Sequence, residues 1–238
     1  MRLIAGLGIG VAILVAATVG AVHFDEFGGV VPKDKKAGAC EKKAALQVAK
    51  TVKSLTVCHM KRALGKLSEA DEETCEKTAT DAFDSHVHGC TAAPCLDKLM
   101  GATISFITDG QSGRVYCSGT TPFGDDKGDG FTAKVPADKK TAKCENKVTM
   151  KAAKLTAAVI GCHLKAAKAA KNSTTDINTD EDCEDAAKSA FKSSAKTTDC
   201  SCIDLDAIAT AIVNLNDLAV ERLACASPSG AFVDGPFD

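Results

Sequence analysis

Aromatic and arginine side chains are scarce in this sequence. It has no Trp, one Tyr and nine Phe among 238 residues, and arginine occurs only at positions 2, 62, 114 and 222. Proteins that bind nucleic acids use arginine forks to read base edges and aromatic rings to stack on bases. The formal net charge is −2, so no positive field replaces those groups. We therefore expect no nucleic-acid partner.

Recognisable catalytic patterns are also missing. No phosphate-binding loop and no ordered Ser-His-Asp set stands out, and the acidic residues fall in runs typical of solvated faces. The 12 cysteines include no C-x-x-C pair, the usual element of a structural zinc site. We therefore expect a protein that is not an enzyme and carries no cofactor.

The N-terminus is strongly apolar. Arg2 is followed by twenty uncharged residues, 3–22. This run is long enough to span a bilayer, and the small residues Val19 and Ala21 also suit cleavage by signal peptidase. We expect residues 1–22 to be a signal peptide or, if uncleaved, a transmembrane anchor. Either outcome exports the body to the periplasm, the cell envelope or the exterior.

An internal repeat is the strongest signal. Six cysteines recur in the same order in each half, which indicates duplication of a unit of roughly 105 residues. The segments that correspond are VPKDKK (31–36) and VPADKK (135–140), Cys40-Glu41 and Cys144-Glu145, Cys58-His59 and Cys162-His163, CEKTATDAFDS (75–85) and CEDAAKSAFKS (183–193), Cys90/Cys95 and Cys200/Cys202, and Cys117 and Cys225.

Each copy is predicted to contain three helices. Apolar residues at helical spacing predict the first helix, acidic runs predict the start of the second, and the third is apolar enough to be buried. The fold class is therefore all-α, with two tandem disulfide-stapled three-helix units behind an N-terminal signal or anchor helix. The expected divisions are 1–22 (signal or anchor), 23–122 (first repeat), 123–131 (linker) and 132–238 (second repeat).

The linker 123–131 is rich in Gly and Asp. Its composition is similar to that of a calcium-binding loop, but the ordered D-x-D-x-D-G series and the closing Glu are missing. We expect a flexible joint.

An even number of cysteines behind an export signal indicates disulfides. In an antiparallel hairpin, the end of the first helix meets the start of the second, which predicts Cys58–Cys75 and Cys162–Cys183. Two cysteines of each copy are not placed by this argument, and cross-links between the copies are one arrangement. The remaining alternatives are Cys40 with Cys90 or Cys95, and Cys144 with Cys200 or Cys202, which leaves Cys117 and Cys225 among the unplaced residues.

The strings CHMKRALGK (58–66) and CHLKAAKAAK (162–171) are each followed by Cys-x3-Ala-x2-Ala-Phe. They resemble the Ala/Lys-rich, cysteine-stapled helical-hairpin repeats of uncharacterised proteins exported by environmental bacteria. The resemblance covers the first two helices of each copy and implies no activity. Repeats of that kind typically have four cysteines, so the third helix and its cysteines depart from the pattern.

Histidines supply the candidate cofactor ligands. Cys58-His59 and Cys162-His163 lack the first Cys of the haem motif C-x-x-C-H, so only a single-thioether variant is conceivable. The simpler interpretation is a disulfide Cys beside a partly exposed His. His86 and His88 form a metal site only if the chain brings them to His59; otherwise they are histidines at a helix C-terminus.

The leading hypothesis is a non-catalytic exported structural or interaction protein: a spacer, a filament or envelope subunit, or an accessory subunit of a membrane complex. A protein partner or self-assembly is expected, with membrane attachment through 3–22 if that segment is retained. The alternative is a haem- or metal-carrying electron-transfer protein that uses the two Cys-His pairs. A small-ligand binder with a pocket between the repeats is a third hypothesis.

Overall fold

The computed structural model describes residues 34–90, 100–128, 131–171 and 178–223. Within these ranges no helix is both long and apolar enough to cross a membrane. The apolar run 3–22 lies outside them, as do Cys95 and Cys225. The elements are α1 (Lys35–Ala63), α2 (Glu69–Val87), α3 (Met100–Val115), β1 (Thr121–Gly128), β2 (Phe131–Val135), α4 (Lys139–Lys171), α5 (Asn178–Ser194) and α6 (Leu205–Leu223).

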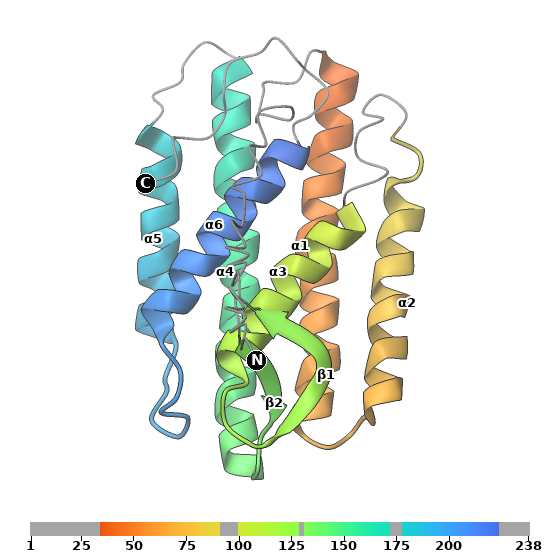
Figure 1. The fold of residues 1–238 in the computed structure, drawn as a ribbon. Coiled ribbons are helices and arrows are strands. Elements are labelled where there is room, and N and C mark those ends of the chain that lie inside the picture. The colour runs from red at the N-terminus through yellow and green to blue at the C-terminus, as the bar shows by residue number, and fades with distance from the viewer. Residues whose placement is uncertain (1–33, 91–99, 129–130, 172–177, 224–238) are drawn as a thin grey trace, which may run out of the picture.

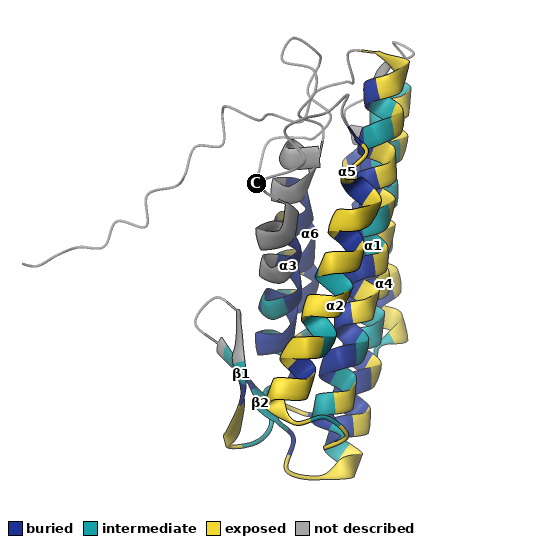
Figure 2. Cartoon of the chain, turned by 90° about the vertical axis from the view of Figure 1, so that its right-hand side faces the viewer, coloured by how far each residue is buried: buried dark blue, intermediate teal, exposed yellow. Residues whose placement is uncertain are grey.

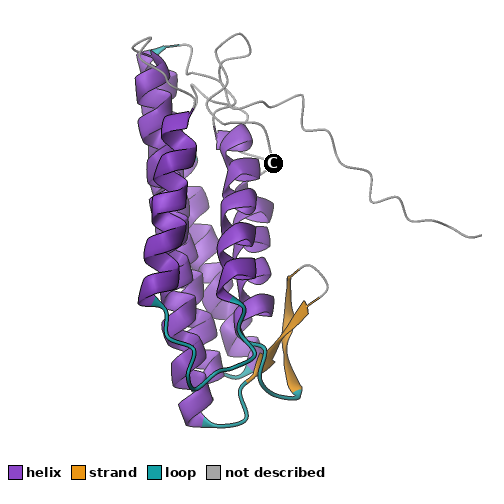
Figure 3. Ribbon diagram, turned by 90° about the vertical axis from the view of Figure 1, so that its left-hand side faces the viewer, coloured by secondary structure: helices purple, strands orange, loops and turns teal. Residues whose placement is uncertain are grey.

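The helices form two layers. Four helices stand side by side in the order α2, α1, α4, α5, and α3 and α6 cross them diagonally in the second layer (Figures 1 and 2). A two-stranded antiparallel hairpin of β1 and β2 lies against α3 at one end of the bundle (Figure 3). The described part of the chain is thus mostly helical, as the sequence predicts, with one small sheet that it did not predict.

Equivalent caps start the two longest helices. The Asp34 carboxylate accepts hydrogen bonds from the amides two and three residues further on, both at 2.8 Å. Asp138 does the same at the start of α4, at 2.8 and 2.9 Å. These bonds satisfy amides that have no partner within the helix, and they lower the pKa of Asp138. The repeated motif VPxDKK therefore marks a helix start in each half.

The two halves of the chain share their hydrophobic cores. Ile160 of α4 and Leu215 of α6 pack into the cluster built mainly from α1, α2 and α3. In return, Val115 of α3 packs into the cluster of α4, α5 and α6. Because α1 also lies along α4, residues 23–122 and 132–238 are not separately enclosed.

The expected flexible linker 123–131 contains most of the β-hairpin. Phe123 is 1% exposed and stacks on Tyr116, with ring centroids 4.8 Å apart. Gly119, just before β1, has a φ of 134°, and a side chain there would collide with the carbonyl oxygen of Val135. A buried aromatic and a conformation that only glycine readily adopts fix the hairpin to the bundle.

Five disulfides brace the described residues. Cys58–Cys75 and Cys162–Cys183 join the end of one helix to the start of the next, as the hairpin argument predicts. At the opposite ends of these hairpins the open alternatives resolve to Cys40–Cys90 and Cys144–Cys200. The fifth, Cys117–Cys202, links the segment after α3 to the segment before α6 and so connects the halves. Such bonding is consistent with an oxidising, extracytoplasmic environment.

Candidate functional site: two buried histidine–carboxylate clusters

The first cluster consists of His59 and Arg62 on α1, Glu72 and Glu76 on α2, and Ser112 on α3. The two glutamates are four residues apart, so they lie on one face of α2, directed at α1. His59 is 1% exposed, and its Nε2 contacts Glu76 Oε1. Its Nδ1 lies 2.6 Å from the Ser112 hydroxyl oxygen. Arg62 Nε lies 3.6 Å from Glu72 Oε2, so the cluster contains its own guanidinium cation.

Ser112, His59 and Glu76 contact one another in that order, and these residue types are those of a nucleophilic triad. Here Ser112 is completely buried, and the Phe123 ring of β1 packs edge-on against the imidazole with centroids 6.3 Å apart. A substrate carbonyl cannot reach the Ser112 hydroxyl in this arrangement. We interpret the first cluster as a buried set of ion-pair and hydrogen-bond contacts that ties α1, α2 and α3 together.

The second cluster consists of His163 on α4, Asp180 and Glu184 on α5, and Asp217 on α6. His163 is 4% exposed. Its Nδ1 lies 3.0 Å from Asp180 Oδ2, and its Nε2 lies 3.2 Å from Glu184 Oε1 and 3.4 Å from Asp217 Oδ1. Three carboxylates from two helices therefore surround a single imidazole contributed by a third.

The clusters lie at corresponding positions of the repeat but differ in charge. His163 occupies the place of His59, Asp180 that of Glu72 and Glu184 that of Glu76, counted from the repeated cysteines. The residue three after the histidine is Arg62 in the first copy and Ala166 in the second, which therefore lacks the guanidinium. The second cluster has two more negative charges than its imidazole can balance.

A neighbouring acid responds to this excess charge. Burial, together with the negative charges of Asp217 and Asp180, raises the pKa of Glu181. The nearby Lys188 ammonium is held 2.6 Å from Asp185 Oδ1, and this hydrogen bond raises its pKa. Lys188 therefore already has a carboxylate partner of its own.

The sulfur atoms of the two Cys-His pairs are bonded in disulfides, Cys58 to Cys75 and Cys162 to Cys183. A thioether to haem would require one of these disulfides to open. The histidines themselves are buried rather than partly exposed, which corrects the simpler interpretation from the sequence. The reason is that the imidazoles point into the carboxylates of the following helix.

His86 and His88 are not brought to His59. Both are exposed at the C-terminal end of α2, where His86 Nδ1 lies 2.6 Å from the Ala82 carbonyl oxygen. His59 meets α2 near its start. The interpretation as histidines at a helix C-terminus therefore agrees with their positions.

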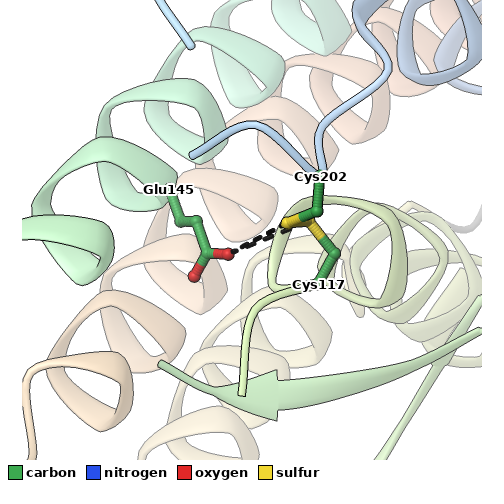
Figure 4. Close-up of side chains that lie close together, drawn as sticks. All are labelled: Cys117, Glu145 and Cys202. Carbon is green, nitrogen blue, oxygen red and sulfur yellow. Dashed lines mark hydrogen bonds between the residues drawn. A yellow bond between two sulfur atoms is a disulfide. The ribbon is translucent and has the colours of Figure 1, made fainter. Parts of the chain in front are cut away.

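Another buried acid, outside both clusters, lies beside the disulfide between the halves (Figure 4). Glu145 projects from α4, and its Oε1 lies 3.8 Å from the sulfur atoms of both Cys117 and Cys202 and accepts a hydrogen bond from the Ser118 amide at 3.1 Å. Burial raises the pKa of Glu145 to about 7. Disulfide sulfur carries no hydrogen, so a thiol donates to this carboxylate only after reduction.

A groove of about 320 Å³ lies between α5 and α6. Its walls include Asp185, Lys188, Lys192 and Asp206, and these charges are already paired, Lys188 with Asp185 and Lys192 with Asp206, each at 2.6 Å. The groove lies within the second half of the chain and not between the halves, where the hypothesis of a small-ligand binder places its pocket.

The acids that α2 and α5 contribute to these clusters are not predicted from the sequence, where acidic runs indicate only the start of a helix. The signal that identifies them is positional: an acid stands three residues before and one residue after the repeated cysteine in each copy, at 72 and 76 and at 180 and 184. The chain matches no family model, and no curated protein or solved structure shows significant similarity to it.

Proposed function

We propose that this chain is a non-catalytic exported protein with a structural or interaction role, as a spacer, a filament or envelope subunit, or an accessory subunit of a membrane complex. The observation that carries the proposal is the set of five disulfides among the described residues. Four fasten both ends of two helical hairpins, and one fastens the halves to each other. Covalent bracing of this density suits a body that keeps its shape outside the cell.

We infer that the body arose by duplication. Supporting this inference, the order long helix, short helix, crossing helix occurs twice, and the disulfides Cys58–Cys75 and Cys162–Cys183 occupy corresponding places. On this interpretation residues 1–22 direct export and, if retained, anchor the body in a membrane. The protein then acts in the periplasm, the cell envelope or the exterior.

The test is to recover the native protein from its source without reductant and to measure its mass and its associations. We expect at least ten hydrogens to be added on reduction, two for each of the five disulfides. We also expect cross-linking to trap an oligomer or a constant protein partner. Recovery as a monomer that cross-links to nothing in its native envelope contradicts the proposal.

The alternative, a haem- or metal-carrying electron-transfer protein, is favoured by one observation: both imidazoles lie among buried carboxylates. A Soret absorption band in the oxidised protein, or a bound metal that changes oxidation state reversibly, supports it. Protein that remains colourless and redox-inert after metal loading excludes it.

A further inference from the structure

The second cluster has an arrangement that an imidazolium alone does not explain. A charge-assisted hydrogen bond from a ring N–H to a carboxylate is typically about 2.7–2.9 Å long. His163 Nε2 instead faces two carboxylates, at 3.2 Å from Glu184 Oε1 and 3.4 Å from Asp217 Oδ1. One N–H reaches both oxygens only as a bifurcated bond, and neither contact has the length of a charge-assisted one. The same spacing matches ligand atoms that share a metal, because tetrahedral bonds of about 2.0–2.1 Å place neighbouring donors about 3.3–3.4 Å apart.

Two carboxylate oxygens in the cluster accept no hydrogen bond from the described residues. These are Asp180 Oδ1 and Asp217 Oδ1, and both are shielded from solvent. Asp180 is 3% exposed and Asp217 is 9% exposed. Buried ionised oxygens without donors are costly, since they have lost their hydration without compensation. A cation bound beside Asp217 Oδ1 supplies the missing interaction at that oxygen.

On the opposite side of the imidazole, a carboxylate holds the ring in the orientation that a metal ligand needs. Asp180 Oδ2 lies 3.0 Å from His163 Nδ1, so it can accept a hydrogen bond from Nδ1–H. This bond selects the tautomer whose Nε2 lone pair is directed at Glu184 and Asp217. A carboxylate behind a metal-ligating histidine commonly fixes ring orientation in this way.

We propose that His163 Nε2, Glu184 and Asp217 bind one first-row divalent cation, with Zn²⁺ as the best match, and that Asp180 orients the imidazole. One nitrogen and two carboxylate oxygens leave a fourth position for water, a set that Zn²⁺ accepts. Ca²⁺ takes six to eight oxygens and is excluded by this donor number. The cation ties α4, α5 and α6 together, as the hydrogen-bond network of the first cluster ties α1, α2 and α3.

The first cluster provides the internal control. Arg62 Nε already lies 3.6 Å from Glu72 Oε2, and His59 Nε2 contacts Glu76 Oε1. Its imidazole and guanidinium balance the two carboxylates, so we expect no divalent cation there. Glu76→Gln and Glu184→Gln are therefore a matched pair of variants at corresponding places of the repeat.

The experiment uses the oxidised, exported chain, stripped with a chelator and titrated with ZnSO₄ in a calorimeter. We expect one Zn²⁺ per chain, no competition from millimolar Ca²⁺ or Mg²⁺, and a visible absorption band when Co²⁺ is bound instead. Glu184→Gln and Asp217→Asn each lower Zn²⁺ affinity at least tenfold, Asp180→Asn lowers it about 10–100-fold, and Glu76→Gln leaves it unchanged.

Three results overturn the site: no stoichiometric Zn²⁺ in the wild-type chain, equal affinity in Glu184→Gln and wild type, or binding lost in the double variant His86→Gln/His88→Gln. The wild-type stoichiometry and the Co²⁺ spectrum decide the question even if a variant fails to fold. Failure of the metal site leaves the structural role intact, because the disulfides and the associations are measured separately.

Discussion

Glu145 shows how a single buried carboxylate makes stability depend on pH. Its pKa is raised from 4.5 to about 7 in the folded protein, chiefly because burial disfavours the charged form. Below about pH 4.5 the group is neutral in both states and costs nothing. As the pH rises from there through 7, the unfolded chain ionises first, and folding loses stability.

Between about pH 4.5 and 8 the wild type should lose up to about 3 kcal/mol of its free energy of unfolding because of Glu145, and we expect Glu145→Gln not to show this loss. The glutamine keeps the carbonyl oxygen that accepts the Ser118 amide hydrogen bond. The measurement is urea unfolding of both proteins across this pH range. Asp84→Asn, which removes a carboxylate from the exposed surface instead, serves as the control variant. Parallel profiles for Glu145→Gln would show that Glu145 titrates normally in the folded state.

The sequence identifies part of these residue-scale features. Repetition of Cys58-His59 as Cys162-His163 draws attention to the two histidines that lie at the centres of the clusters. Their burial was not predicted, because an acidic run beside a histidine has the same composition whether it faces water or another helix. Asp217 carries no local signal at all, since only the diagonal crossing of α6 brings it to His163.

At the scale of elements, helices are predicted well and the hairpin is not. The capping motif at Asp34 and Asp138 locates the start of the long helices, because a cap depends only on local residues. The segment 123–131 has the composition of a flexible joint. Its ordered structure depends on contacts of Phe123 with Tyr116 and His59. The composition of the segment does not indicate these contacts, and His59 is distant in the sequence.

We expect Phe123→Ala to destabilise the protein by about 3–5 kcal/mol, the usual range for removing a buried phenylalanine ring. The exposed Thr121→Ala in the same strand should change the free energy of unfolding by less than about 0.5 kcal/mol. Thermal and denaturant unfolding of both variants, compared with the wild type, checks this. If both substitutions were equally mild, the segment would be a loose linker after all.

At the scale of the whole molecule, the halves are more interdependent than a tandem repeat requires. The halves share their hydrophobic cores, and hydrogen bonds also join one half to the other. Gln111 Nε2 of α3 donates to Thr156 Oγ1 of α4 at 2.7 Å. The side chain of Asn146 accepts from the Tyr116 hydroxyl at 2.8 Å and donates to the Met60 carbonyl at 3.1 Å. Periodicity shows how wide an apolar face is, but it does not show which helix covers that face.

This interdependence predicts that neither half folds as a monomer. Residues 34–120 alone would expose the faces of α1 and α3 that Ile160 and Leu215 cover. Residues 121–223 alone would lose Val115 from their core and the Cys117–Cys202 bridge. We expect each half to be unfolded or to associate with a second copy, and the complete oxidised chain to unfold in one transition seen alike by all probes. Light scattering, near-ultraviolet circular dichroism and amide NMR spectra of the halves test this. A monomeric half with dispersed amide signals and its own cooperative transition would instead make the molecule two independent units, with the hairpin as the joint between them.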